Sequence, residues 1–247
     1  MTHQDVLAVI PVRWGSTRFP GKALADLEGR PLVEHVWRHA MAARSIDRVV
    51  VATDDERILA AVTDFGGEAV MTAATHHSGT DRVAAVALTT SCRVVVNIQG
   101  DEPLLDPEAM DAAVAPLLAD DTLEATTLAA PLAEGDHADD PHLVKVVTAA
   151  NGDALYFSRS PIPFQRNREA EATFLHHIGL YAFRRELLAE FSKWPPGNLE
   201  RAEGLEQLRL LERGRRLRVI LVQHAFPGID TPRDLARVAA LLRAPAP

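Results

Sequence analysis

Short apolar runs alternate along the first half of the chain with stretches whose apolar residues recur at helical spacing. The helical stretches are PLVEHVWRHAMAA at 31–43 and DERILAAVTDF at 55–65. The apolar runs are VLAVIPV at 6–12, RVVVAT at 48–53, EAVMT at 68–72 and VVVNIQG at 94–100. This alternation predicts a parallel sheet with covering helices. Runs that are apolar throughout, rather than at every second position, indicate strands buried on both faces.

The second half has a different pattern, with longer strands and a predicted hairpin. Asn151-Gly152 is a strong turn pair inside VKVVTAANGDALYFSR. Strands are predicted at 125–132, 176–184 and 217–223, and helices at 184–194, 199–214 and 231–243. Gly214 suits the end of the second of these helices, and Thr231-Pro232 the start of the third. No linker is long enough to divide the 247 residues, so a single α/β domain is predicted.

Composition narrows the possible functions. A chain that is 47% hydrophobic and 24% charged has the make-up of a soluble globular protein. Its net charge of −8 argues against nucleic-acid binding. No apolar run reaches the roughly 18 residues of a membrane span, and the N-terminus has no secretory pattern. The single cysteine, Cys92, forbids an intrachain disulfide, fits a cytoplasmic location, and is expected to be buried.

A basic loop follows the first strand, in RWGSTRFPGK at 13–22. It collects Arg13, Arg18 and Lys22, together with two glycines that allow the backbone to approach a ligand. In α/β sheets ligands bind at this end of the strands, so the loop predicts a polyphosphate site. It is not a Walker loop, because five residues separate the glycines and alanine follows the lysine. The alternative is a solvated basic loop.

Carboxylates and a second loop follow other strands. Asp101 comes directly after the fourth predicted strand, and Asp230 directly before the last helix. The two aspartates can converge on one Mg²⁺, or they can be a turn residue and a helix cap. In HHSGTDR at 76–82, Ser78-Gly79 permits tight backbone contact with a flat base. Arg82 is expected near the nucleotide or in a structural salt bridge.

The motif Arg-x-x-Ser-Thr-Arg-x-Pro-Gly-Lys resembles the signature loop of sugar nucleotidyltransferases that use CTP. More narrowly, the chain is similar to the 3-deoxy-manno-octulosonate (Kdo) cytidylyltransferase family. The likeness continues, in order, through VATDDERI, HHSGTDRVA, VVNIQGDEPL, VKVV, ALYFSRSPIPF, HHIGLYAFR, LEQLRLLERG and GIDTPRDL. The resemblance implies a Rossmann-like, mixed-sheet nucleotidyltransferase fold akin to glycosyltransferase A. Residues 1–125 and 220–247 would bind the nucleotide, and 126–219 would bind the sugar and form a dimer.

The resemblance also implies roles for individual residues. The implied catalytic residues are Arg13, Lys22, Asp101 and Asp230, with Mg²⁺ held by Asp101 and Asp230. The implied nucleotide-binding residues are Arg13, Ser16, Arg18, Lys22, Thr53, Ser78, Gly79, Arg82 and Asp101. The implied sugar-binding residues are Gln99, Arg159, His177, Tyr181, Glu206 and Gln207. Arg159 would pair with the sugar carboxylate, where a bidentate guanidinium is the natural partner.

One part of this sugar site has an independent pattern. Glu203, Glu206 and Gln207 share one face of the helix predicted at 199–214. Without the resemblance, that helix is a solvated charged face.

The implied reaction transfers CMP from CTP to the anomeric hydroxyl of Kdo and releases pyrophosphate, as a step of lipopolysaccharide biosynthesis. The implied protein is a cytoplasmic homodimer that contacts neither nucleic acid nor membrane. One alternative is a cytidylyltransferase for 8-amino-Kdo, another keto-acid sugar or a phosphonate. Another is a catalytically inactive sugar-nucleotide-binding protein, against which the intact Arg13, Lys22, Asp101 and Asp230 speak.

Overall fold

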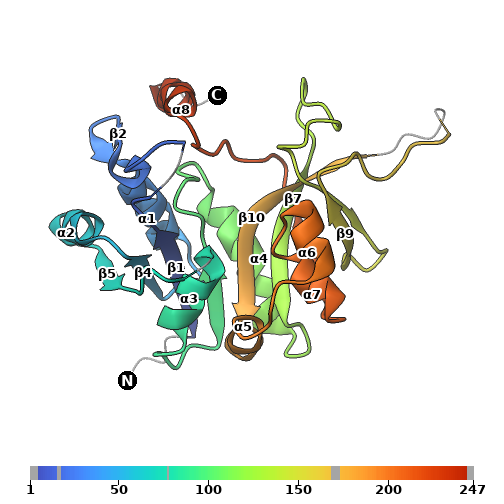
Figure 1. Cartoon of the computed structure of the whole chain (residues 1–247), viewed down its shortest axis with the longest axis horizontal. Helices are drawn as coiled ribbons and strands as arrows, with labels where there is room; N and C mark the ends of the chain where they lie inside the picture. Colours follow the sequence, from blue (N-terminus) through green and yellow to red (C-terminus); the bar gives the residue numbers. More distant parts are fainter. Residues whose placement is uncertain (1–4, 16–17, 77, 168–172, 244–247) are drawn as a thin grey trace. The chain divides into compact units, whose positions relative to one another are not determined.

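The computed structural model describes residues 5–15, 18–76, 78–167 and 173–243 (Figure 1). The chain forms two compact units. Unit 1 consists of Met1–Asp111 and Phe226–Pro247, and unit 2 of Ala112–Ala225. The α-helix α4 (Pro107–Ala119) carries the chain from one unit into the other. The assignment of nucleotide and sugar roles to two parts of the chain stays a prediction.

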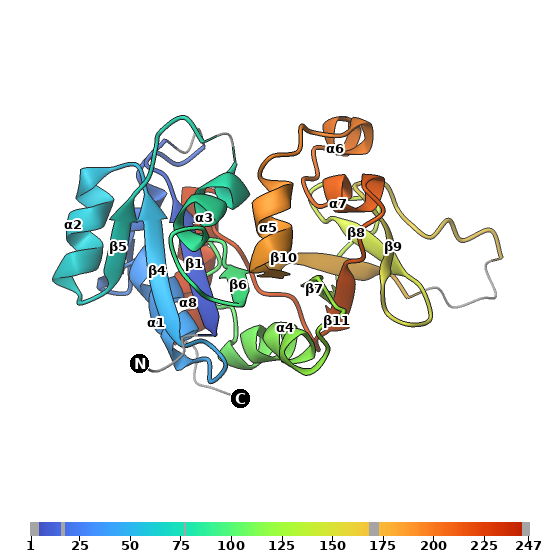
Figure 2. The same ribbon diagram turned by 90° about the horizontal axis from the view of Figure 1, so that it is seen from below.

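Unit 1 is built on a parallel sheet. Its strands are β1 (Val6–Val12), β4 (Arg48–Thr53), β5 (Glu68–Met71) and β6 (Val94–Asn97), in the order β5-β4-β1-β6. Val9 of β1 pairs with Val50 on one side and Asn97 on the other. β1 lies beside β4 in this sheet (Figure 2). β1, β4 and β6 are buried along almost their whole length, which explains their continuous apolar sequences. The predicted parallel sheet is confirmed.

The strand order places a topological switch point between β1 and β6. From β1 the chain proceeds outward through β4 to β5, and then returns to the opposite side of β1 as β6. The loops that leave the carboxyl ends of β1 and β6 therefore turn away from each other and open a crevice. Ligands of open α/β sheets bind at such a crevice, and both the basic loop and Asp101 follow these two strands.

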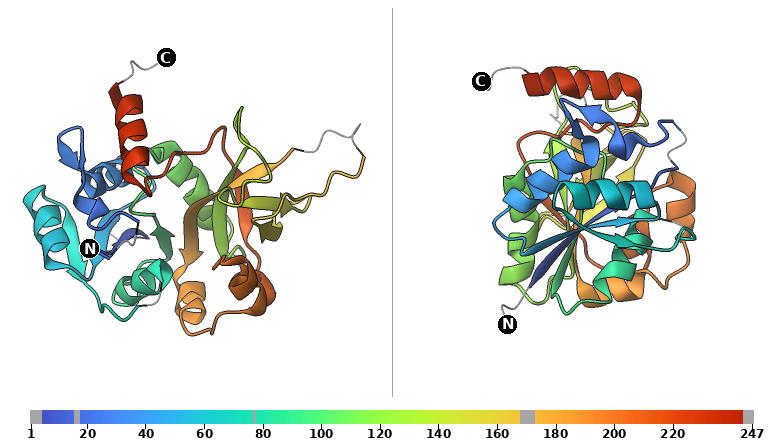
Figure 3. Two further views of the ribbon diagram at one scale, coloured as in Figure 1. Left: turned by 45° about the horizontal axis from the view of Figure 1, so that its top comes forward. Right: turned by 90° about the vertical axis from the view of Figure 1, so that its left-hand side faces the viewer.

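The helices of unit 1 are α1 (Leu32–Ala42), α2 (Glu56–Asp64), α3 (Gly79–Ala87) and α8 (Pro232–Arg243). A 3₁₀ turn, η1 (Lys22–Leu24), and a small hairpin of β2 (Asp26–Leu27) and β3 (Arg30–Pro31) precede α1. α1, α2 and α8 confirm the predicted helices. α8 lies beside the small hairpin, where Arg243 Nε donates to Glu28 Oε1 at 2.8 Å (Figure 3).

Unit 2 contains a mixed sheet. Its strands are β7 (Ala125–Pro131), β8 (Lys145–Thr148), β9 (Ala154–Ser158), β10 (Leu175–Arg184) and β11 (Arg218–Leu221). β11 runs parallel to β7, whereas β10 is antiparallel to both β7 and β8. β8 and β9 form the predicted hairpin, with Gly152 at φ +84° in its turn.

The helix predicted at 199–214 is wrong. The structure has two short helices instead, α6 (Asn198–Glu203) and α7 (Leu208–Glu212), which follow α5 (Arg185–Phe191). Gly204 ends α6 in the left-handed conformation, at φ +64°, where the first helix stops. Glu203 therefore does not share a helical face with Glu206 and Gln207. Gly214, at φ +69°, follows α7 closely, as expected of a helix stop.

Candidate active site

A cleft of about 340 Å³ lies in unit 1 beside the ends of β1 and β6. It collects side chains from four separate segments: the basic loop, the residues around the start of α3, the loop after β6, and Asp230, two residues before α8. Its polar lining consists of Arg13, Arg18, Lys22, His76, Ser78, Arg82, Gln99, Asp101 and Asp230. Gly100 also lines it and must be small, because a Cβ there would lie 3.0 Å from Val12 Cγ2 and 3.2 Å from the Pro11 carbonyl oxygen.

Trp14 shapes the basic loop. The Gly21 N–H donates to the Trp14 carbonyl at 3.1 Å, and Gly21 adopts φ +69°. A Cβ on Gly21 would lie 2.9 Å from Cη2 of the indole, so only glycine fits under the ring. Arg57 of α2 covers the ring, with Cζ 3.3 Å from the ring centroid, and pairs with Asp55 at 2.6 Å. The loop that carries the cations is thus held against α2.

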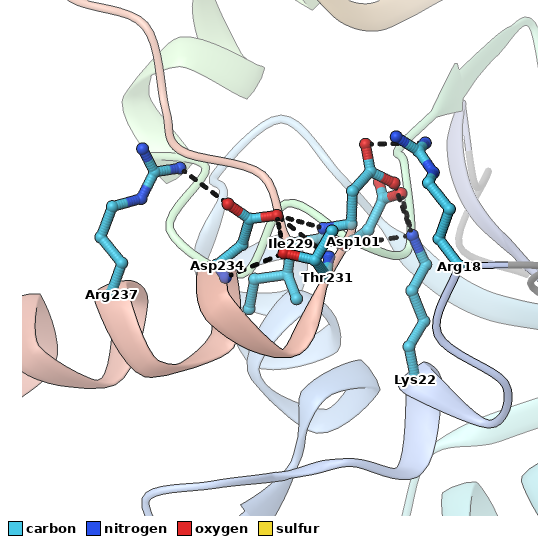
Figure 4. A network of polar contacts seen from close by, with 8 residues as sticks. Arg18, Lys22, Asp101, Ile229, Thr231, Asp234 and Arg237 are labelled. Atoms are coloured by element: carbon cyan, nitrogen blue, oxygen red, sulfur yellow. Dashed lines mark hydrogen bonds and ion pairs between the residues drawn. The ribbon is translucent and has the colours of Figure 1, made fainter.

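Lys22 joins the two predicted metal-binding aspartates. Its Nζ donates to Asp101 Oδ2 at 2.6 Å, to Asp230 Oδ1 at 3.2 Å and to the Ile229 carbonyl at 3.1 Å (Figure 4). Arg18 pairs with the other oxygen of Asp230 at 3.0 Å. The Ile229 N–H donates to the Asp101 carbonyl at 2.9 Å and ties the two segments together. Residues far apart in sequence therefore meet at one point of the cleft.

Asp230 is also placed by the cap of α8. The Thr231 hydroxyl accepts from the Asp234 N–H at 3.3 Å, while the Asp234 carboxylate accepts from the N–H groups of Asp230 and Thr231 at 3.2 and 3.0 Å. The helix cap predicted at Thr231-Pro232 is confirmed. These bonds leave the carboxylate of Asp230 for Lys22 and Arg18, so the capping role falls to its neighbours.

The remaining charges of the cleft favour an anion. Arg13 is exposed, and within the described part of the chain it forms no ion pair. The N-terminus of α3, at Gly79, lines the cleft and adds the positive end of a helix dipole there. Ser78 and Asp81 form a capping box, in which Ser78 Oγ accepts from the Asp81 N–H at 3.1 Å. Sequence reasoning treated 76–82 as a loop and missed this helix, although the Ser-x-x-Asp spacing is a capping signal.

Arg82 was expected either near the nucleotide or in a structural salt bridge, and the structure places it both at the cleft and in a salt bridge. It lines the cleft, and it is only 4% exposed because its guanidinium forms a salt bridge to Asp54 at 2.7 Å and contacts Thr72 Oγ1. Thr53 is fully buried and accepts from the Asp55 N–H at 3.2 Å, away from the cleft lining. Ser16 lies outside the described residues. The nucleotide roles of these residues stay predictions.

Glu102, next to Asp101, has a different character from the two aspartates. Its Oε2 is buried and has no hydrogen-bond partner among the residues that the structure describes. Burial, with a smaller effect of the neighbouring Asp101, raises the pKa of Glu102 to about 8. At neutral pH this carboxyl is mostly protonated, and the contacts to Lys22 are made by Asp101 and Asp230 instead.

Gln99 stands apart from the other predicted sugar residues. It lines the cleft of unit 1, where its Nε2 lies 3.4 Å from Asn97 Oδ1. The other five predicted sugar residues belong to unit 2. Among them, Gln207 is buried, and Glu206 lies 3.5 Å from the Arg209 guanidinium, which pairs mainly with Glu200 at 2.6 Å.

His177 is buried and Tyr181 half-buried in a row of aromatic rings that joins β10 to Phe157 of β9. The His177 ring stands edge-on to Phe157, with centroids 4.9 Å apart, and lies 5.5 Å from Tyr181. Its Nε2 is 2.9 Å from the Thr127 hydroxyl. Burial, with a smaller effect of His176, lowers the pKa of His177 to about 3. His177 is therefore a neutral hydrogen-bonding group at physiological pH.

Arg159 follows β9 and is bound on several sides. Its Nε donates to the Glu203 carbonyl at 2.8 Å and its Nη1 to the Pro141 carbonyl at 2.8 Å. The Glu203 carboxylate accepts from the Arg159 N–H at 2.9 Å and from Ser158 Oγ at 2.6 Å. Lys145 Nζ donates to the Arg159 carbonyl. Sequence reasoning chose neither Glu203 nor Lys145 as a site residue. Lys145 binds backbone carbonyls, and Glu203 binds the Arg159 N–H and the Ser158 hydroxyl, and neither set of contacts follows a spacing in the sequence.

The oxygens around Lys22 Nζ form a donor set that suits Mg²⁺. Two carboxylates and one carbonyl lie within 3.2 Å of a single cationic atom, so one small cation can reach the same oxygens. Mg²⁺ is bound by one or two carboxylates, with phosphate and water oxygens completing its shell. The described residues contain no cluster of three or more histidine, cysteine, aspartate or glutamate side chains that could hold a metal. A site for Mg²⁺ shared with phosphate fits these residues better than a closed protein cage.

Comparison with known proteins gives a consistent result. The cytidylyltransferase family profile matches residues 7–217. The 3-deoxy-manno-octulosonate cytidylyltransferase of Solibacter usitatus is 48% identical over 241 residues, covering 98% of this chain and 96% of the relative. Its counterpart in Geobacter sulfurreducens is 47% identical, covering 97% of this chain and all of the relative.

The chain belongs to the 3-deoxy-manno-octulosonate cytidylyltransferase family. The solved structure of a CMP:2-keto-3-deoxy-manno-octonic acid synthetase complexed with CTP superposes with a TM-score of 0.92, at 43% identity, over 96% of this chain and 98% of that one. A 4-diphosphocytidyl-2C-methyl-D-erythritol synthase from Anaerococcus prevotii, at 15% identity, has a TM-score of 0.64 and shares the fold. The predicted nucleotidyltransferase fold, family and enzyme class are confirmed. None of the described helices has the length and apolar character needed to cross a membrane.

Proposed function

We propose that this protein transfers CMP from CTP to the anomeric hydroxyl of Kdo, giving CMP-Kdo and pyrophosphate for lipopolysaccharide biosynthesis. The observation that carries the proposal is the meeting of Lys22, Asp101 and Asp230 in a cleft that also holds Arg13 and Arg18. The family's relatives are named for this reaction, and one is complexed with CTP. Cations and carboxylates together suit a triphosphate bound with its metal ion.

The cationic side chains would bind the triphosphate and the departing pyrophosphate. Arg13 is exposed at the cleft, and Arg18 and Lys22 reach it from the same loop. The N-terminus of α3 supplies further N–H donors and the positive end of a helix dipole. Phosphoryl and nucleotidyl transfer need positioning and charge neutralisation more than covalent catalysis. The local positive charge therefore matches the substrate, although the chain as a whole is negative.

Asp101 and Asp230 would hold Mg²⁺ in the cleft. When bound, the ion neutralises phosphate charge and polarises the α-phosphorus. Lys22, which contacts both carboxylates, would also offer its ammonium group to the phosphate oxygens of the bound triphosphate. The two aspartates act as ligands rather than as bases, so their contribution depends on their negative charge.

The acceptor side of the proposal rests on unit 2. Arg159 would bind the carboxylate of Kdo, with His177, Tyr181, Glu206 and Gln207 around the sugar, while Gln99 lies with the nucleotide residues in unit 1. Other acceptors with the same carboxylate, such as 8-amino-Kdo or another keto-acid sugar, remain the alternatives, together with a phosphonate.

We further propose a cytoplasmic homodimer. Support for association comes from unit 2, where Phe164 is 85% exposed and Leu155 of the edge strand β9 is 62% exposed. Both lie in or next to the ALYFSRSPIPF block. The location follows from the proposed substrate, because CTP is a cytoplasmic metabolite. Sedimentation of the purified protein at micromolar concentration tests the dimer, and a monomer at every concentration contradicts it.

The reaction is tested by pyrophosphate release from the purified protein with CTP and Mg²⁺, with and without Kdo, beside ATP, GTP and UTP. Release that requires both CTP and Kdo supports the proposal. Pyrophosphate release with a different acid, but not with Kdo, would mean that the assignment of the acceptor is wrong. CTP binding without turnover of any acceptor supports an inactive binding protein.

The metal site is tested by replacing one carboxylate at a time. Asp101→Asn retains the shape of the side chain and removes its charge, so turnover at saturating Mg²⁺ is expected to fall at least ~100-fold. Asp64→Asn is the matched control, because Asp64 is exposed at the end of α2 and is not part of the cleft lining. Unchanged turnover of Asp101→Asn would exclude the aspartate as a metal ligand.

A further inference from the structure

Arg159 offers only part of its guanidinium to a ligand. A guanidinium has five N–H groups, one on Nε and two on each Nη. The Nε–H donates to the Glu203 carbonyl, and one Nη1–H donates to the Pro141 carbonyl. Within the described residues, the other three N–H groups, on Nη1 and Nη2, make no hydrogen bond. The side-on edge formed by Nε and Nη2 is therefore closed, and a carboxylate can bind in the two-bond manner only at the end-on edge.

Lys145 fixes both the backbone of Arg159 and one of the acceptors of its side chain. Lys145 is completely buried, and its Nζ donates to the carbonyls of Asp140 at 2.9 Å, Leu143 at 2.6 Å and Arg159. These three bonds use all the donors of an ammonium group. Because residues 140–143 include Pro141, the same lysine holds the segment that receives Arg159 Nη1. Burial lowers the pKa of Lys145, and nearby Asp140 opposes that effect.

Glu203 fixes Arg159 from the other side without neutralising it. Its carboxylate binds the Arg159 N–H and Ser158 Oγ, and its backbone carbonyl binds Nε. Among the described residues, the Arg159 guanidinium forms no ion pair with any carboxylate. Glu203 is the last residue of α6, so its carbonyl is one of the unpaired acceptors at a helix end, and Arg159 caps it. The positive charge of Arg159 is thus oriented but left without a counter-ion.

We propose that Lys145 and Glu203 are positioning residues that hold Arg159 so that its end-on edge meets the carboxylate of the acceptor. They set the preference of the enzyme for an acidic sugar over a neutral one. This inference rests on the proposed function, since it assumes that unit 2 binds the acceptor. Neither residue needs to touch the substrate, because each acts through the backbone and the fixed donors of Arg159.

The test compares steady-state kinetics of Glu203→Gln, Lys145→Met, Arg159→Lys and the Glu203→Gln/Arg159→Lys double variant. Glu203→Gln is expected to raise the KM for Kdo about 10-fold, since a misplacement near 1 Å can cost as much as 100-fold, and to leave kcat and the KM for CTP within about twofold. Lys145→Met is expected to act in the same direction. The double variant is expected to be no worse than Arg159→Lys, because both changes remove the same interaction. Glu124→Gln is the control, since Glu124 pairs with Arg215 at 2.8 Å elsewhere in unit 2.

Each result decides the proposal. A KM for Kdo that is unchanged in Glu203→Gln, or effects of Glu203→Gln and Arg159→Lys that multiply, overturns the positioning role. Equal changes in kcat and in the KM for CTP would show general damage to the fold and overturn it as well. If Lys145→Met does not fold, the Glu203 variants decide. Failure of the proposed function is seen separately, as no turnover of Kdo by the unmodified protein. The variants are then assayed with whichever acid the protein accepts, and both proposals fall if it accepts none.

Discussion

Replacing His177 with glutamine should make the protein resist acid better. The His177 side chain is buried, with its residue only 8% exposed, and its Nε2 lies 2.9 Å from the Thr127 hydroxyl. That hydroxyl donates to the Leu180 carbonyl at 2.8 Å, so it accepts from a ring that carries its proton on Nε2. Burial lowers the pKa of His177 and so keeps this ring neutral in the folded protein at physiological pH. A glutamine amide can donate to the same hydroxyl without a titratable group.

The magnitude follows from the two pKa values of the histidine. Burial lowers the pKa of His177 from 6.5 to about 3 in the folded state. Below pH 6.5 His177 binds a proton in the unfolded chain but stays neutral in the folded chain. The free energy of unfolding therefore falls as the pH falls, until about pH 3. With about 1.4 kcal/mol per pH unit, this residue alone removes ~2 kcal/mol between pH 8 and pH 5. The glutamine variant lacks this loss.

The assay is urea unfolding of both proteins at pH 8, 6.5 and 5, followed by far-UV circular dichroism. Other titrating groups contribute equally to the two proteins, so the difference between them isolates His177. His142→Gln is the control, because His142 is an exposed histidine of the same unit. Parallel loss of stability in the unmodified protein and in His177→Gln between pH 8 and pH 5 would refute a neutral buried His177. So would an NMR titration of its ring with a midpoint near 6.

Three further substitutions test other parts of the structure. Gly21 has φ +69°, and a Cβ there would lie 2.9 Å from Trp14, so Gly21→Ala should raise the KM for CTP several-fold and lower the free energy of unfolding by ~1–3 kcal/mol. Gly29 has φ +81° with open space around it, so Gly29→Ala should lower the free energy of unfolding alone. Equal KM values for CTP in the two variants would contradict the role of the indole. Arg57→Met removes the cation over Trp14, so it should raise the KM for CTP and change the tryptophan fluorescence. An unchanged KM for CTP would show that the basic loop keeps its conformation without Arg57. Gly204→Ala, at φ +64° with no atom near its Cβ, should cost about 1–2 kcal/mol in urea unfolding, and no cost would mean that the chain escapes the left-handed conformation there.

The strands of both units could be predicted because buried strands have a simple pattern of apolar residues in the sequence. β1, β4 and β6 are covered on both faces, so they consist of unbroken apolar runs, and the turn pair Asn151-Gly152 separates β8 from β9. The break between α6 and α7 is less visible. Leucines at 199, 205, 208 and 210 continue a helix-like pattern through Gly204, and only the backbone conformation of that residue shows where α6 ends.

Some site residues could likewise be predicted from the sequence, whereas others could not. Arg13, Arg18, Lys22, Asp101 and Asp230 lie in short motifs next to strand or helix ends, where geometry brings ligand-binding groups together. The sequence predicted that Asp101 and Asp230 can converge, but not that both contact Lys22 Nζ, since this depends on how distant segments pack.

Glu203 and Lys145, the two residues proposed to position Arg159, belong to no such motif. Lys145 donates to the Arg159 carbonyl and Glu203 accepts from the Arg159 N–H, and nearly every residue offers these two backbone groups. No motif or spacing in a sequence can therefore identify these contacts in advance.

Unit 1 is interrupted in the chain, and this has a consequence for biosynthesis. Its first segment ends at Asp111, and the segment that brings Asp230 begins only at Phe226, after the whole of unit 2. On the ribosome, Lys22 and Asp101 are made long before their partner, whereas unit 2 is continuous and complete at Ala225. Domains generally fold as units as the chain emerges. A chain that stops short of Asp230 therefore carries a full unit 2 and an unfinished cleft, so the cleft can be completed only after unit 2 has been synthesised.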